Sequence, residues 1–260
     1  MRVGIVGTGA IGMPMVRRMT GDGHQVAAYA RRPEAIAELE GLQVTVVSSA
    51  ARVAEGAEVV VLCPFTDAQV RDIAIPDALL AAMGPGTVVV IHTTGSPSTA
   101  RALQDAAPDG VEVLDAPISG GPPDIEAGAV TLYVGGSDSG LARARPVLAA
   151  YGQPILHLGP LGSGQLVKLI NNALFAAQVQ LAAAALRIGR GLGIDGTALA
   201  DAVAAGSGAS RAMTILGGDL GRLEGLRRFL AKDIDVLLEV ATALPLDLGI
   251  LGDAASAGFR

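Results

Sequence analysis

Six short runs of β-branched and aliphatic residues constrain the fold of the first 150 residues most strongly. The segments between them, such as MPMVRRMTGDG, carry apolar residues at helical spacing. Continuous apolar strands that alternate with helices are typical of a mostly parallel sheet with helices on both faces. The predicted strands are 2–6, 25–30, 43–47, 58–64, 87–93 and 112–117. We expect a seventh, 129–136, to join one edge of this sheet as in a hairpin.

A different composition begins at Gly164, where β-branched runs end and Ala, Leu and Arg dominate. This change predicts an all-helical second domain. We place the domains at 1–162 and 163–260, with the boundary in the segment GPLGS. The predicted helices are 165–192, 196–205, 210–217 and 223–243, the last one ended by Pro245.

Charge and composition exclude several classes of function. The net charge of −6, the pI near 5.0 and the aromatic content of 3% offer neither a basic field nor stacking platforms for nucleic acid. A single cysteine, Cys63, rules out an intrachain disulfide, and three histidines have no zinc-type spacing, so we expect no metal. These features favour a reducing, cytoplasmic setting.

The chain is strongly hydrophobic: half of its residues are hydrophobic and the mean hydropathy is +0.48. The most apolar window, 173–186, contains two glutamines and is shorter than the roughly 20 residues that a bilayer requires. We therefore expect a buried helix, no membrane span and no signal peptide. The Ala-rich helical domain has little interior of its own, which predicts a homodimer built on it.

The segment GTGAIG, residues 7–12, lies between the first strand and a helical pattern. In this context Gly7 allows a tight turn, Gly9 lets the backbone approach a pyrophosphate, and Gly12 allows close packing of helix on strand. A turn without a ligand is the alternative. The fold class is then α/β, a Rossmann-type, doubly wound sheet followed by an all-α domain. The predicted cofactor loop consists of Gly7, Thr8, Gly9, Ala10, Ile11 and Gly12.

Two arginines follow the second strand. An acidic residue that binds the ribose of NAD should stand near position 30, but Ala30 occupies it and Arg31 and Arg32 follow. Guanidinium groups can bind a 2′-phosphate, which predicts that NADP(H) is preferred over NAD(H). Two solvated arginines are the alternative. Loops after the fourth and fifth strands add possible cofactor neighbours, namely Pro64, Phe65 and Thr94.

The segment GQLVKLINN opens the long apolar helix. Gly164, Lys168 and Asn172 are spaced i, i+4, i+8 and share one helical face, which continues with Phe175. A polar stripe that ends after two turns is typical of a cleft wall. Burial beside an apolar helix would lower the pKa of such a lysine toward the range useful for proton transfer. The alternative is an ordinary surface lysine.

Two further segments carry candidate groups. In DAPISGGPP, the loop of Ser119, Gly120 and Gly121 could hold a carboxylate or could be only a turn. In FLAKD, Lys232 and its neighbouring aspartate face a cleft or decorate a helix. We interpret Cys63 as a buried small residue and His92 as a hydrogen-bonded structural histidine.

These motifs occur in an order that resembles the β-hydroxyacid dehydrogenase family, which includes 3-hydroxyisobutyrate dehydrogenase and glyoxylate/succinic semialdehyde reductases. The resemblance spans residues 1 to about 235. It implies hydride transfer between a nicotinamide and a small acid or its semialdehyde. It also implies that Lys168 is the general acid/base, that Asn172 holds substrate or lysine, that Ser119, Gly120 and Gly121 bind the carboxylate, and that Lys232 helps to hold it or contacts the cofactor.

The chain departs from the family pattern at its end. The segment IDVLLEVATALPLDLGILGDAASAGFR follows FLAKD, and we expect one terminal helix to be missing or reduced. Imine reductases, a sister group, typically replace the helix lysine with another residue. An imine reductase and a catalytically silent NADP-binding sensor therefore remain as alternative functions.

Overall fold

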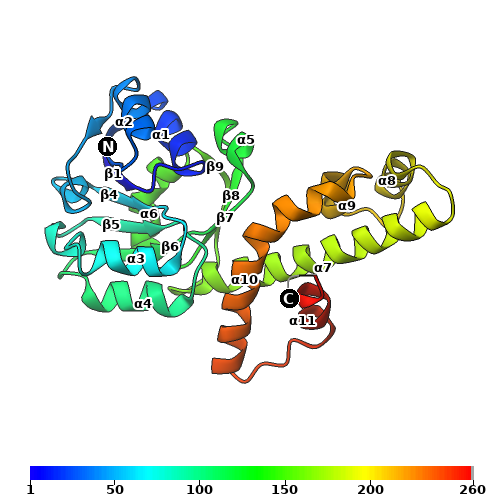
Figure 1. Ribbon diagram of the computed structural model, residues 1–260. Coiled ribbons are helices and arrows are strands. Elements are labelled where there is room, and N and C mark those ends of the chain that lie inside the picture. Colours follow the sequence, from blue (N-terminus) through cyan, green and yellow to red (C-terminus); the bar gives the residue numbers. More distant parts are fainter. Residues whose placement is uncertain (259–260) are drawn as a thin grey trace. The chain divides into compact units, whose positions relative to one another are not determined.

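The computed structural model describes residues 1–258, which form two compact units, Met1–Lys168 and the helical part from Leu169 onward. The first unit contains a six-stranded, entirely parallel sheet of order β3-β2-β1-β4-β5-β6 (Figure 1). This confirms the predicted doubly wound sheet. Its strands are β1 (Arg2–Val6), β2 (Gln25–Tyr29), β3 (Thr45–Val46), β4 (Val59–Leu62), β5 (Val88–Ile91) and β6 (Glu112–Asp115).

Both faces of the sheet are buried, which explains the continuous apolar runs. Along β4, Val59 and Val61 point into one apolar cluster while Val60 and Leu62 point into the other. Helices α1, α2 and α6 cover the first face, and α3 and α4 cover the second. These helices span Gly12–Gly21 (α1), Pro33–Glu40 (α2), Asp67–Ala74 (α3), Pro97–Ala106 (α4) and Asp138–Leu148 (α6).

The predicted seventh strand does not extend the large sheet. It is β8 (Val130–Val134) in a separate three-stranded sheet of order β7-β8-β9, with β7 at Ile118–Ser119 and β9 at Gly152–His157. A single bridge, Asp115 to Gly135, joins it to the end of β6. The hairpin partner of β8 is the short β7, followed by α5 (Pro122–Glu126), so the expected edge position was wrong.

The second unit is helical, as expected. It contains most of α7 (Ser163–Gly191), then α8 (Gly196–Ala205), α9 (Arg211–Leu216), α10 (Leu223–Ala243) and α11 (Gly249–Ser256). Its core joins apolar residues of all five helices, among them Ala183, Met213 and Leu237. After Pro245 the chain forms one further helix, α11, which was not among the predicted helices.

Helix α7 is long and apolar enough to cross a bilayer when judged by length and composition alone. Half of its most apolar window is buried inside the protein, and a buried core helix meets the same two criteria. Among the described residues, α7 is the one helix that is long and apolar enough.

Candidate functional site

The loop between β1 and α1 has the geometry that the glycine pattern predicts. Gly7 has a φ of +105°, and a Cβ at this position would overlap the carbonyl group of Cys63. A Cβ at Gly12 would overlap the Gly7 carbonyl oxygen, so no larger residue fits there. No atom lies within 4 Å of the position that a Cβ of Gly9 would occupy, and the backbone there is accessible. Each glycine therefore meets the requirement assigned to it from the sequence.

The N-terminus of α1 is suited to an anion. Ile11 occupies the N-cap and forms no side-chain cap hydrogen bond. The helix dipole and the first-turn N–H groups favour negative charge at such an end. This end lies at β1, whose neighbours are β2 on one side and β4 on the other, the point where strand order reverses. Because parallel sheets bind ligands at this switch point, the residues present fit a dinucleotide.

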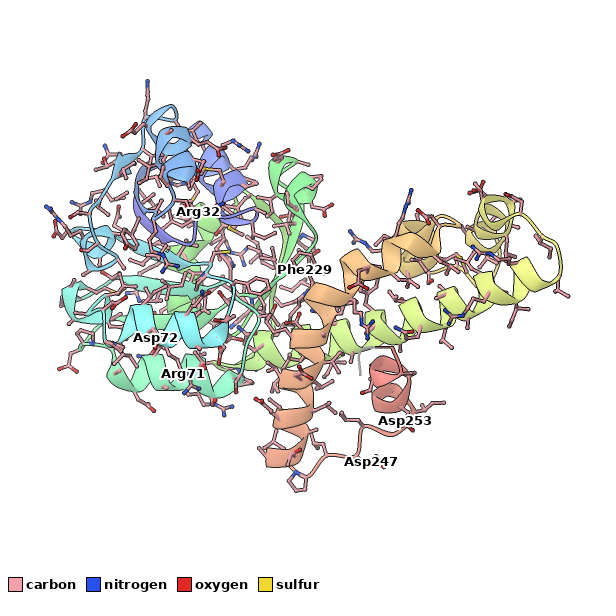
Figure 2. All side chains as sticks on the ribbon, viewed as in Figure 1. Arg32, Arg71, Asp72, Phe229, Asp247 and Asp253 are labelled. Atoms are coloured by element: carbon pink, nitrogen blue, oxygen red, sulfur yellow. The ribbon has the colours of Figure 1, made fainter. Side chains whose placement is uncertain are left out.

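The second strand brings two arginines to the same edge. Val6 at the end of β1 pairs with Tyr29 at the end of β2, so the residues after Tyr29 lie beside the glycine loop. Both Arg31 and Arg32 are exposed there, and Arg32 is the N-cap of α2 (Figure 2). The chain thus presents two guanidinium groups and no carboxylate at residues 30–32.

The loops after β4 and β5 are joined to each other. The Thr93 hydroxyl donates to the Pro64 carbonyl oxygen over 2.7 Å. Phe65 is half exposed beside it, and its N–H donates to Gln69 at 3.0 Å within the capping box of α3. Thr94 follows in the β5 loop. The predicted cofactor neighbours Pro64, Phe65 and Thr94 therefore lie at the carboxyl edge of the sheet.

A buried carboxylate holds the start of α7. Asp115, at the end of β6, accepts hydrogen bonds from Gly162 N and Gln165 N, each 2.6 Å long. Burial raises the pKa of this carboxyl, and the surrounding backbone N–H groups oppose that shift. Gly164 packs so closely that a Cβ would lie 2.9 Å from two oxygens of Asp115. The predicted polar stripe therefore begins with a glycine that is required for packing.

Gln165 adds a second attachment that the sequence pattern did not reveal. Its Oε1 accepts from Gly95 N at 3.0 Å and its Nε2 donates to the Thr93 carbonyl at 2.8 Å. The side chain is buried, at 2% exposed. Gln165 thus ties the first turn of α7 to the loop after β5.

Lys168 stands one turn further along α7 and is only 9% exposed. This burial excludes an ordinary surface lysine, the alternative that spacing left open. Lys168 is the last residue of the first unit, and Asn172 follows one helical turn later in the second.

The second unit positions Asn172 through an aspartate. The Asn172 side-chain amide donates to Asp233 Oδ2 over 2.6 Å, and Asn171 donates to Asn172 Oδ1 over 3.1 Å. Lys232 Nζ lies 2.7 Å from Asp233 Oδ1. Asn172, Lys232 and Asp233 therefore form one cluster, and the aspartate that joins the other two is buried.

The predicted carboxylate loop is more structured than expected. Ser119 ends β7, and Gly120 has a φ of +139°, a conformation that suits glycine. The Gly121 N–H already donates to Asp124 Oδ2 at 2.7 Å, at the start of α5. In this conformation the Gly121 N–H is engaged within the loop.

His92 is buried and hydrogen-bonded, as interpreted from the sequence, whereas Cys63, interpreted as buried, is only partly buried at the edge of the core. His92 Nδ1 lies 2.6 Å from the Ala116 carbonyl oxygen and Nε2 lies 2.8 Å from the Tyr151 hydroxyl. Burial lowers the pKa of His92 to about 4, so the ring is neutral near pH 7 and Nδ1–H donates to the carbonyl. Burial raises the pKa of the Cys63 thiol to about 12, which removes it as a nucleophile. Within residues 1–258, no three acidic, histidine or cysteine side chains gather as a metal site.

Comparisons with known proteins agree with the dinucleotide-binding fold. Residues 2–159 match the family model for the NAD-binding domain of 6-phosphogluconate dehydrogenase, and residues 162–257 match that for the NAD-binding of NADP-dependent 3-hydroxyisobutyrate dehydrogenase. A 3-hydroxyisobutyrate dehydrogenase of Pseudomonas aeruginosa is 34% identical over 82% of this chain and 72% of its own length. An NAD-dependent L-serine dehydrogenase of the same organism is 31% identical over 93% of this chain and 86% of its own length.

Solved structures are also similar. The 3-hydroxyisobutyrate dehydrogenase of Mycobacterium tuberculosis with L-serine has a TM-score of 0.86 and 28% identity over 99% of this chain and 94% of its own. An imine reductase from Myxococcus stipitatus has a TM-score of 0.69 and 18% identity, over 98% of this chain and 92% of its own. The second likeness concerns the fold alone.

Proposed function

Because the chain belongs to the 3-hydroxyisobutyrate dehydrogenase family and is an NAD(P)-binding oxidoreductase, we propose that it interconverts a small β-hydroxyacid and its semialdehyde or keto form, with NADP(H) preferred and Lys168 as general acid/base. The observation that carries the proposal is a buried lysine on α7, anchored to the carboxyl edge of a dinucleotide-binding sheet. When bound, the nicotinamide supplies or accepts the hydride.

The side chains of α7 do the proton chemistry in this proposal. Lys168 Nζ gives a proton to the nascent alkoxide oxygen in reduction and takes it from the alcohol in oxidation. Asn172 orients the lysine or the substrate hydroxyl. The Asn172 amide donates to Asp233 Oδ2, and this hydrogen bond limits its rotation before substrate binds. Lys232 Nζ, held beside Asp233, adds positive charge for an acid substrate or for the cofactor.

Lys168→Ala tests this assignment. We expect kcat to fall by about 10²–10⁴-fold, the usual contribution of general acid–base catalysis, with the dissociation constant of NADPH unchanged by fluorescence titration. Arg187→Ala, an exposed cation further along α7, is the matched control and should keep both constants. A Lys168→Ala enzyme with near-normal turnover would remove the lysine from the mechanism.

A carboxylate is the second recognition element of the proposed substrate. The Ser119 hydroxyl and the Gly120 backbone provide the donors for it, beside the turn that begins α5. The named substrates of the relatives are serine, 3-hydroxyisobutyrate and 2-(hydroxymethyl)glutarate. In each of them a hydroxymethyl group and a carboxylate are attached to the same carbon. Activity of the wild type on such acids or on their semialdehydes, lost with the matching alcohols that lack the carboxylate, would support this assignment. For Ser119→Ala, KM for the acid should rise.

The cofactor preference rests on residues 30–32. Arg31 and Arg32 are both exposed at the end of β2 where an acidic residue would select NAD. We expect the double variant Arg31→Ala, Arg32→Ala to lose NADPH affinity by 10-fold or more and to keep NADH affinity. Equal affinities for the two cofactors in the wild type, unchanged in the double variant, would show that the arginines are only solvated.

The same substrate panel separates the alternatives. An imine reductase would oxidise NADPH with cyclic imines but not with semialdehydes, and a silent sensor would bind NADPH and turn over neither. A buried acid/base lysine favours the hydroxyacid reaction over both.

We also propose that two chains pair through α7. Four large apolar side chains stand exposed on this helix at spacings of 4, 7 and 7 residues, a pattern that fits helix packing against a second copy. Leu181→Glu should convert the dimer to a monomer by light scattering, whereas a monomeric wild type at micromolar concentration would contradict the pairing. The four are Ile170, Leu174, Leu181 and Ile188.

A further inference from the structure

We propose that Gln165 is a positioning residue, an amide clamp that fixes Lys168 relative to the cofactor-side loops, and this inference rests on the proposed role of Lys168. Its carboxamide spans the loop after β5, accepting from Gly95 N at 3.0 Å and donating to Thr93 O at 2.8 Å. Both bonds are made to backbone more than 65 residues away in the sequence, so they fix tertiary position rather than helix structure.

The clamp continues across the carboxyl edge of the sheet. The Thr93 hydroxyl donates to Pro64 O over 2.7 Å, which joins the β5 loop to the β4 loop. Lys168 follows Gln165 by three residues, or about 4.5 Å along the helix axis, in a stretch of continuous α-helix. A chain of hydrogen bonds and one rigid helical turn therefore connects Pro64 to Lys168.

Asp115 holds the same turn of α7 through its carboxylate. Its two carboxylate oxygens accept from Gly162 N and Gln165 N, so the backbone and the side chain of Gln165 are both held. Two independent attachments on one residue leave little freedom for the first turn of α7. Buried polar groups so well matched are costly to disturb, because losing one partner leaves the other unsatisfied.

The chain contains a matched control for this clamp. Gln104 on α4 makes the same pair of bonds, donating from Nε2 to Val111 O at 3.1 Å and accepting from Val113 N at 2.9 Å. These partners flank the beginning of β6, the edge of the sheet opposite to Asp115. Gln104→Met and Gln165→Met thus each remove two hydrogen bonds of a side-chain amide from the same unit. Only Gln165→Met removes them beside Lys168.

The experiment compares these two variants with the wild type and with Lys168→Ala. For Gln165→Met we expect kcat to fall about 10–100-fold, the effect of a misplacement near 1 Å, with KM changed less than threefold. NADPH affinity should stay within threefold, and the amides of residues 166–170 should exchange hydrogen faster. Gln104→Met should keep kcat within twofold. Gln165→Glu keeps the acceptor for Gly95 N but turns a carboxylate oxygen toward the Thr93 carbonyl in a buried site, so its fall in kcat should be at least as large as that of Gln165→Met.

The outcomes separate two failures. If Lys168→Ala remains active, the proposed function fails and the positioning role falls with it. If Lys168→Ala is inactive but Gln165→Met matches Gln104→Met in kcat and in exchange, the clamp is only structural and this inference alone is overturned. Should Gln165→Met fail to fold, Gln165→Asn, whose shorter amide does not reach both partners, decides by the same criterion, with a kcat unchanged within twofold counting against the clamp.

Discussion

Replacement of Gly164 by alanine tests whether the start of α7 is fixed by close packing. A Cβ there would lie 2.9 Å from both Asp115 O and Asp115 Oδ2, and closer still to the carbonyl oxygen of Tyr133. Carbon–oxygen contacts need more than about 3.3 Å, so helix and sheet would have to separate by roughly 0.5–1 Å. All three atoms belong to backbone or to a buried side chain, and none can move aside easily.

The expected cost follows from this overlap. Overpacking of a rigid site costs about 1–3 kcal/mol, while alanine gains at most about 1 kcal/mol in helix propensity over glycine. The net loss of roughly 1–2 kcal/mol corresponds to a Tm lower by about 2–8 °C for a unit of this size. Because Lys168 stands one turn later, kcat should fall as well.

Calorimetry and steady-state kinetics measure the two effects, and Gly191→Ala is the matched control. Gly191 belongs to the same helix, but a Cβ there would meet nothing within 4 Å. We expect Gly191→Ala to keep or raise Tm and to leave kcat unchanged. A Gly164→Ala protein as stable and as active as the wild type would refute the packing argument.

Three other predictions concern groups in the core or at its edge. The pKa of His92 is lowered from 6.5 in the unfolded chain to about 4 in the folded protein. Between these two values the unfolded chain binds more protons, so the free energy of unfolding falls as the pH drops. From pH 7 to pH 5 this fall is about 2 kcal/mol. Urea unfolding should show this slope in the wild type and lose it in His92→Gln. The partly buried Cys63 thiol, with its pKa raised to about 12, should react with a thiol reagent at pH 8 much more slowly in the folded protein than after unfolding. Asp115→Asn turns an amide N–H toward a backbone N–H donor, so the free energy of unfolding, measured in urea, should fall by about 2–3 kcal/mol. Asp105 is exposed, and Asp105→Asn should leave this free energy unchanged.

The large sheet could be predicted because its central strands are buried on both faces. Runs such as EVVVLCP and TVVVIHT are too short and too continuously apolar to be predicted as helices. The glycine loop indicated that β1 leads directly into α1. The helices of the second unit were predicted to within two residues at most ends for a similar reason, since apolar periodicity continues through each of them.

The small sheet and the last helix lacked such signals. The strand β9 contains Pro154 and is largely exposed, as an edge strand can be, and β7 has only two residues. The sequence LGDAAS of α11 gave no cap or strong stripe to indicate a helix. Elements that depend on one partner strand or on packing against another helix leave a weak local pattern.

Gly164 and the polar residues of GQLVKLINN are required for different physical reasons. Their spacing in the sequence does not distinguish these reasons. Gly164 is small because Asp115 and Tyr133 occupy the space beside it, and Gln165 is polar because two backbone groups of the β5 loop need partners. Gln165 lies about 100° around the helix from Gly164, so a search for one polar stripe passes over it. Its partners lie some 70 residues away, and no local pattern can show them. A conservative-looking change at residue 165 should therefore alter the enzyme more than its place outside the stripe suggests, because the position of Lys168 depends on it.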